Sequence, residues 1–75
     1  MEVAVTTPIV LHGEHITLAQ AVKRAGLAET GGQAKLLVRA GKVRVNGAAL
    51  QRPGHKLHAG DRVGDDTGRE WIIQA

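Results

Sequence analysis

The sequence predicts an α+β fold in which two short helices precede a set of short strands. Two segments, 17–25 and 31–40, repeat apolar residues at helical spacing, and Thr17 at the start of the first and Thr30 before the second fit helix N-caps. Residues 43–50 combine alternating apolar residues with an Asn-Gly pair, the pattern of a β-hairpin. Residues 61–64 and 69–74 are predicted to be the last two strands, joined by a turn.

Length and composition restrict the class of protein. A chain of 75 residues without cysteine predicts one domain over 1–75, with no disulfide or thiolate metal site and a reducing, cytoplasmic setting. No apolar run approaches the roughly 20 residues needed to cross a bilayer, and the first residues lack the pattern of a signal peptide. We therefore expect no membrane association. Trp71 is the only Phe, Trp or Tyr, so the core should be aliphatic.

The N-terminal part is expected to contribute a strand and the first helix. Residues 1–8 are predicted to be an irregular terminus, and residues 9–13 a short strand. Helix 17–25 should begin with a capping box, in which Thr17 and Gln20 satisfy each other's backbone amides. The apolar stripe of this helix, spaced i, i+3, i+4 and i+7, consists of Leu18, Ala21, Val22 and Ala25.

The second helix should carry a charged stripe beside its apolar one. Thr30 and Gln33 have the spacing of a second capping box, and Gly41 is expected to end the helix. Its core-facing residues are predicted to be Ala34, Leu37 and Val38. Cationic residues spaced i, i+4 and i+7 form the second stripe, namely Lys35, Arg39 and Lys42.

Gly31 and Gly32 open the second helix and need an explanation, because glycine in a helix costs about 1 kcal/mol relative to alanine. One explanation is that bare backbone N–H groups at a helix N-terminus accept a phosphate closely. The other is that glycine simply provides a permissive entry turn. The residues alone favour neither explanation, because no complete phosphate-binding loop is present.

The hairpin and the loop after it extend the basic character of the chain. Arg44 should face solvent between two core valines, and Asn46 should serve the turn rather than contact a base edge or a 2′-hydroxyl. Residues 51–61 are predicted to be a loop with Leu57 as its single apolar anchor. Trp71 is expected to belong to the core rather than to a base-stacking platform.

Charge is distributed unevenly along the chain. Residues 17–58 hold eight lysines and arginines against one glutamate, a net charge of +7, whereas residues 1–16 and 59–75 each carry −2. A basic middle between acidic ends favours a polyanionic partner over a merely solubilising surface, in which both signs usually mix.

Catalysis and metal binding find little support. The chain has no serine or cysteine nucleophile. His55 and His58 have H-x-x-H spacing, but no cysteine or carboxylate pair completes a metal site. Asp61, Asp65 and Asp66 are attributed to surface turns. We therefore expect a protein that is not an enzyme and that uses no cofactor or metal.

The pattern TLxxAVxxAGLxxTGGQAKxLVxxGKVRVNG, followed by GD, resembles the RNA-binding module of ribosomal small-subunit protein four, the alpha-L RNA-binding motif. The resemblance covers about residues 16–63 and is closest to stand-alone bacterial proteins of the YbcJ/YaaA-like group. It implies two helices packed on a small, mostly antiparallel sheet, with the second helix and the following hairpin facing RNA. Much of the family opens the second helix with Ser-Arg-Ser, whereas this chain has Thr30-Gly31-Gly32, so a contact there would come from backbone amides.

The sequence therefore predicts a monomeric, non-catalytic protein that binds structured RNA of the ribosomal or transfer RNA class. A single tryptophan is too few for the stacking platforms of single-strand binders, which favours folded RNA. The alternatives are a protein-interaction module that docks on an acidic or ribonucleoprotein partner, or a DNA-binding protein. The predicted RNA-binding residues are Gly31, Gly32, Gln33, Lys35, Arg39, Lys42, Arg44, Asn46, Arg52, His55 and Lys56.

Overall fold

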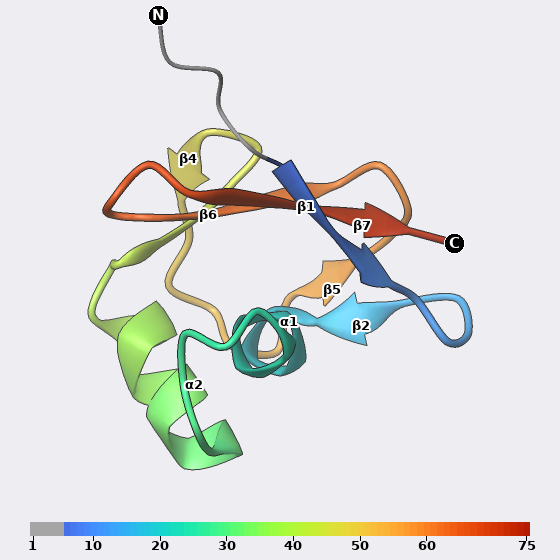
Figure 1. Cartoon of the computed structure of the whole chain (residues 1–75). Helices are drawn as coiled ribbons and strands as arrows, with labels where there is room; N and C mark the ends of the chain where they lie inside the picture. The colour runs from blue at the N-terminus through green and yellow to red at the C-terminus, as the bar shows by residue number, and fades with distance from the viewer. Residues whose placement is uncertain (1–5) are drawn as a thin grey trace, which may run out of the picture.

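The computed structural model describes residues 6–75, which form two helices and two sheets (Figure 1). The elements in chain order are β1 (Thr6–Val10), β2 (Ile16–Thr17), α1 (Leu18–Arg24), α2 (Gly31–Arg39), β3 (Val43–Val45), β4 (Ala48–Ala49), β5 (Lys56–Leu57), β6 (Arg62–Asp65) and β7 (Glu70–Gln74). Neither helix in this part of the chain is long and apolar enough to cross a membrane. The predicted α+β class is confirmed.

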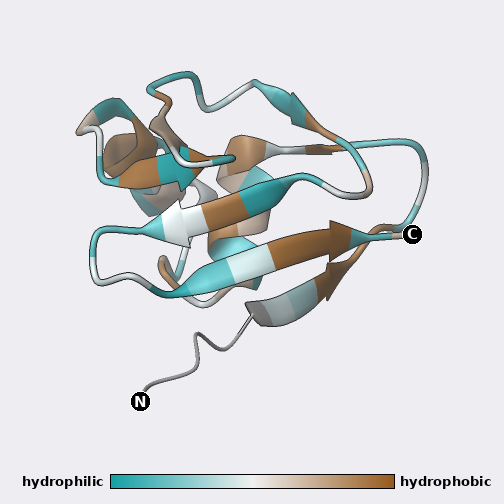
Figure 2. Cartoon of the chain, turned by 90° about the horizontal axis from the view of Figure 1, so that it is seen from above, coloured by the Kyte–Doolittle hydropathy of each residue, from teal (hydrophilic) through white to brown (hydrophobic). Residues whose placement is uncertain are grey.

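The larger sheet has the strand order β1-β7-β6-β3-β4. β1 runs parallel to β7, and every other pair of neighbours is antiparallel, which agrees with the expected mostly antiparallel sheet. β2 and β5 form a separate antiparallel pair. Both helices lie on one face of the larger sheet, and the view from above in Figure 2 shows its other face uncovered.

The prediction for the N-terminal segment was partly wrong. Residues 6–8, expected to be irregular, are the first half of β1, and the predicted strand 9–13 continues no further than Val10. Residues 1–5 of the expected irregular terminus lie outside the described residues. Pro8 is tolerated because β1 is an edge strand, where a missing N–H need not break the ladder. Pairing with β7 organises β1, and this contact is distant in sequence.

The small β2–β5 sheet was not predicted from the sequence. It pairs Ile16 with Leu57 and Thr17 with Lys56, and only its second strand, β5, lies inside the expected loop 51–61. Two-residue strands are too short to show alternation. The predicted anchor role of Leu57 is confirmed, because its side chain is fully buried.

The N-termini of the two helices follow the threonine signals closely but not identically. Thr17 and Gln20 form the complete capping box of α1, with N···O distances of 3.0 and 3.2 Å. In α2 only half of the predicted box is present: the Gln33 N–H donates to Thr30 Oγ1 at 3.1 Å. Gln33 Oε1 accepts instead from the Glu29 N–H, one residue earlier than expected, at 3.0 Å.

Both helices end in a Schellman motif. At the end of α2, Gly41 N–H donates to the Val38 carbonyl and Lys42 N–H donates to the Leu37 carbonyl, with N···O distances of 3.0 and 3.3 Å. Gly41 has φ +76°, a left-handed conformation that glycine adopts without strain. The same arrangement ends α1 at Gly26, whose φ is +80°. The chain is thereby reversed sharply after each helix.

The core is aliphatic apart from one indole, as expected. Trp71 lies in it, so the prediction of a core role rather than a free stacking platform is confirmed. The one buried charged residue among those described is Asp65, which had been attributed to a surface turn. The largest fully buried side chains are Leu18, Leu57, Ile73, Val22, Val38, Val43 and Val63.

Candidate functional site

The outward face of α2 presents the first two members of the predicted cationic stripe. Ala34 and Val38 are fully buried, so the helix turns Lys35 and Arg39 to solvent. Leu36 lies on the same exposed side, with 66% of its surface accessible. An exposed leucine between two cations was not singled out from the sequence, because one apolar residue on a helix surface is common.

The N-terminus of α2 is open to an approaching group. Gly31 and Gly32 are both exposed, and neither needs φ > 0. A Cβ added at Gly31 would meet nothing within 4 Å, and one at Gly32 would only approach Thr30 Oγ1 at 3.8 Å. Within residues 6–75 no acceptor bonds to the N–H group of either glycine. The fold thus places no steric or conformational demand for glycine here, and it leaves two amides free at the positive end of the helix dipole.

The prediction that Lys42 continues the cationic stripe of α2 was wrong. The Schellman motif ends the helical path at Gly41 and turns the backbone toward β3. The exposed Lys42 side chain instead borders a hollow between the end of α2 and the β6–β7 turn. Two backbone hydrogen bonds fix the reversal, so the place of Lys42 is determined by the fold.

The basic loop between β4 and β5 is attached to both helices. Gln51 Nε2 donates to the Arg39 carbonyl at the end of α2, at 3.0 Å. At the start of α1, the Leu18 and Ala19 N–H groups donate to the carbonyls of His55 and Pro53, at 2.8 and 3.0 Å. These bonds satisfy backbone carbonyl and N–H groups that have no partner within the helix, at the end of α2 and the start of α1. They place the start of the loop beside the end of α2 and its end beside the start of α1. The exposed predicted site residues of this stretch are Arg52 and His55 in the loop and Lys56 at the start of β5.

Arg44 lies on a different face from the α2 cations. Val43 and Val45 point into the core, so alternation along β3 directs Arg44 to the uncovered face of the sheet. Its Nη1 donates to the Asp65 carbonyl at 3.3 Å. Because Asp65 also borders the hollow beside Lys42, Arg44 and Lys42 reach the same end of the molecule from opposite sides of the sheet.

Asn46 serves the hairpin turn, as preferred from the sequence. Its φ of +51° and the +87° of Gly47 match a type I′ turn. Its amide oxygen accepts from the Arg62 N–H at 2.9 Å, and its Nδ2 donates to Asp61 Oδ1 at 3.3 Å. The side chain therefore connects the turn to the segment that leads into β6.

Among residues 6–75, the cations near α2 form no ion pair. Ion pairs within residues 6–75 join Arg62 to Glu70 and Arg69 to Asp65. Glu29, the single carboxylate of the basic segment, lies just before α2 and forms no ion pair among the described residues. We call the following cations the basic surface: Lys35, Arg39, Lys42, Arg52 and Lys56.

The β6–β7 turn next to the basic surface is built on Asp65. Its Oδ1 accepts from Thr67 N–H, Thr67 Oγ1 and Arg69 N–H at 3.0, 2.7 and 2.9 Å, and its Oδ2 accepts from Arg69 Nε at 3.3 Å. Burial by itself raises the pKa of this carboxyl. The hydrogen bonds from Thr67 and Arg69 together outweigh burial and leave the pKa below its usual value.

Arg69 is the residue of this region that sequence reasoning missed. Its guanidinium carbon lies 5.2 Å from the centroid of the Trp71 ring, over the indole. The signal that could have found it is the period of two: in the predicted strand 69–74, Arg69 and Trp71 fall on the same face. The histidines gather elsewhere: His15 and His58 have ring centroids 6.4 Å apart, and residues 6–75 contain no group of three potential metal ligands.

Comparison with known proteins identifies relatives of this architecture. A family model described as the S4 domain matches residues 9–72. No curated protein matches the sequence significantly. Among solved structures, that of YbcJ from E. coli, a solution structure that reveals an alfaL motif involved in RNA binding, is similar with a TM-score of 0.70. The two sequences are 29% identical, and the similarity covers 100% of this chain and 95% of YbcJ. These findings confirm the resemblance predicted from the sequence.

Proposed function

Because this chain belongs to the S4 domain family, we propose that it binds RNA, and that it does so without catalysing a reaction. The RNA-binding motif of the similar protein YbcJ supports this proposal. We further propose that the target is a structured RNA of the ribosomal or transfer RNA class, that the basic surface contacts its phosphates, and that the protein acts as a monomer in the cytoplasm.

One observation carries the assignment to the basic surface. Its five cations are exposed and take no part in an ion pair among the described residues. A phosphate can therefore bind them without first displacing a carboxylate, and release of counterions from the RNA adds to the affinity. A cation that already forms an ion pair within the protein, such as Arg62 with Glu70, contributes less to phosphate binding.

The α2 N-terminus supplies the second part of the proposed surface. The free N–H groups of Gly31 and Gly32 lie one to two turns before Lys35 and Arg39 on the same helix. An anion there gains from the helix dipole and from close approach to a backbone without side chains. Gln33, Arg44, Asn46 and His55 also remain predicted contacts of the RNA, and of these Arg44 lies on the face of the sheet opposite the helices.

Salt dependence of binding tests the proposal. If about five phosphates are neutralised, log K against log[salt] for a folded RNA should have a slope of roughly −3.5 to −4.5. We expect Lys35→Ala with Lys42→Ala to flatten the slope by about two units, at roughly one unit per phosphate contact. Arg62→Ala, at an exposed but ion-paired cation on β6, is the matched control and should leave the slope nearly unchanged.

The outcomes separate the alternatives. An unchanged slope in the double variant would remove both lysines from the interface. Equal affinity for a DNA duplex of the same sequence would favour a general polyanion or DNA binder. No binding to any nucleic acid, with capture of an acidic protein, would favour the protein-interaction module.

A further inference from the structure

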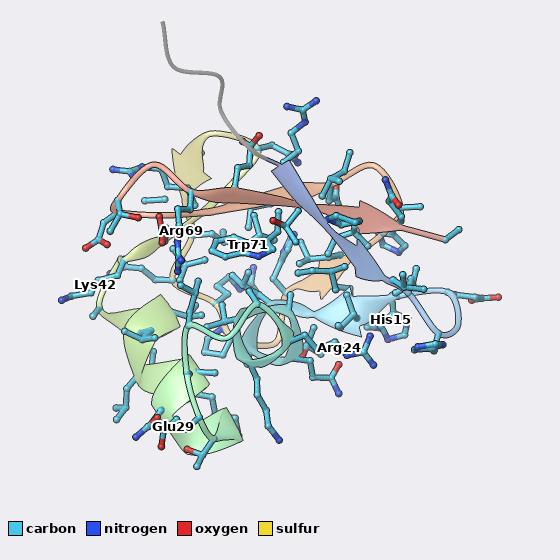
Figure 3. The ribbon with its side chains drawn as sticks, in the orientation of Figure 1. His15, Arg24, Glu29, Lys42, Arg69 and Trp71 are labelled. Atoms are coloured by element: carbon cyan, nitrogen blue, oxygen red, sulfur yellow. The ribbon has the colours of Figure 1, made fainter. Side chains whose placement is uncertain are left out.

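The hollow beside Lys42 is lined in a way that suits a flat, uncharged group. Half-buried Leu27 and Leu37 contribute apolar surface from the helical side, and Arg69 lines it from the sheet side. Figure 3 shows Arg69 directed from the β6–β7 turn toward the helices, next to Trp71, with Lys42 at the same end of the molecule.

Arg69 is held in position although most of its side chain is exposed. Asp65 pairs with its Nε at 3.3 Å, and the Trp71 indole lies beneath its guanidinium at 5.2 Å. Even so, 64% of the side chain is accessible. A planar guanidinium fixed by two contacts loses little freedom when a second planar group stacks on it, and nucleobases stack on arginine planes.

The charges around the hollow favour a base over a phosphate. Lys42 and Arg69 are balanced by the carboxylates of Asp65 and Asp66, which also line it. Balanced charge inside the hollow gives a phosphate no net attraction there, while the exposed Lys42 ammonium at its border can still bind a phosphate outside the hollow. A base gains apolar contact with the two leucines, and its polar edge can meet the exposed Asp66 carboxylate as acceptor and the Lys42 ammonium as donor.

We propose that this hollow receives one unpaired nucleobase, extruded from a bulge or loop of the RNA whose phosphates lie on the basic surface. The inference rests on the proposed function and adds a local requirement for an unpaired base. Lys42 belongs to both the hollow and the basic surface, so a base here would adjoin the phosphates bound by α2. Arg69 then supplies the stacking plane for which the sequence offers no free aromatic residue.

The test compares three RNA hairpins with the same duplex: fully paired, with a one-nucleotide bulge, and with the same bulge made abasic. The bulged hairpin should bind about tenfold more tightly than the other two, as expected for one stacked base. Trp71 is the only tryptophan, so its emission should change with the bulged hairpin and much less with the abasic one.

Arg69→Lys keeps the positive charge but removes the planar guanidinium. We expect this variant to reduce the tenfold preference for the bulged hairpin to less than threefold, while the salt slope stays unchanged. Arg62→Lys is the control and should keep the preference. If Arg69→Lys unfolds, the abasic hairpin with the unaltered protein decides the question. Equal affinity for the three hairpins, or a preference that survives in the abasic one, would overturn this inference alone. Failure to bind any of them would overturn the proposed function and the inference together.

Discussion

Asp65→Asn tests the structural basis of the β6–β7 turn. Asp65 is 7% exposed, and its carboxylate accepts four hydrogen bonds from Thr67 and Arg69. An asparagine of the same shape can keep its single oxygen at the Oδ1 position, but it loses the negative charge and cannot accept from Arg69 Nε. Hydrogen bonds to a charged group contribute about 1.5–3 kcal/mol, against about 1 kcal/mol for neutral ones.

We expect Asp65→Asn to lower the free energy of unfolding by about 2–3 kcal/mol at pH 7. The pair with Arg69 adds little to this figure, because that side chain is 64% exposed and its charge is screened by solvent. In a domain of this size, 1 kcal/mol corresponds to about 4–8 °C in Tm, so Tm should fall by about 10–20 °C. Thermal unfolding followed by circular dichroism and Trp71 fluorescence measures the change.

The pH dependence supplies an independent check. The pKa of Asp65 is lower in the folded protein than its usual value of 3.8. A carboxyl whose pKa is lowered by folding contributes stability at pH values above its unfolded pKa, and this contribution is lost as the pH falls through the folded pKa. The difference in the free energy of unfolding between the unaltered protein and Asp65→Asn should therefore have its largest value at pH 7 and pH 5. It should become smaller below about pH 4.

Asp66→Asn is the matched control, because Asp66 is the exposed neighbour of Asp65. It should change the free energy of unfolding by no more than about 0.5 kcal/mol. The reasoning would be refuted by a Tm for Asp65→Asn within about 2 °C of the unaltered protein, by equal effects of the two variants, or by a difference that stays constant down to pH 3.

Two further predictions concern α2 and the small sheet. Gly31→Ala with Gly32→Ala should keep or raise Tm, since alanine is the better helix former by up to about 1 kcal/mol per site, while RNA affinity falls because the methyl groups block the amides. Unchanged affinity in this variant would assign the glycines to the entry turn alone. Leu57→Ala should cost about 2–5 kcal/mol in urea unfolding, since the side chain is fully buried opposite Ile16. A cost below about 1 kcal/mol would show that the β2–β5 pair contributes little to stability.

Local signals in the sequence were sufficient for the helices and the hairpin. Thr17 with Gln20, and Gly41, mark helix ends because caps depend on residues only a few positions apart. Asn46-Gly47 determines its turn for the same reason, since both residues must adopt φ > 0. The sequence also predicted the family, the set of cationic residues and the core position of Trp71.

Only the tertiary structure decided which of these residues share a surface. Arg44 faces away from the helices because its two valine neighbours are needed in the core, and Lys42 leaves the helical stripe because Gly41 reverses the chain. β1, the β2–β5 pair and the buried carboxylate of Asp65 depend on partners brought from elsewhere in the chain or on burial within the finished turn. Spacing predicts contacts within a turn or two. The joining of Gln51 to the end of α2, and of Arg69 to Leu27 and Leu37 around one hollow, arises when the sheet and the helices pack together.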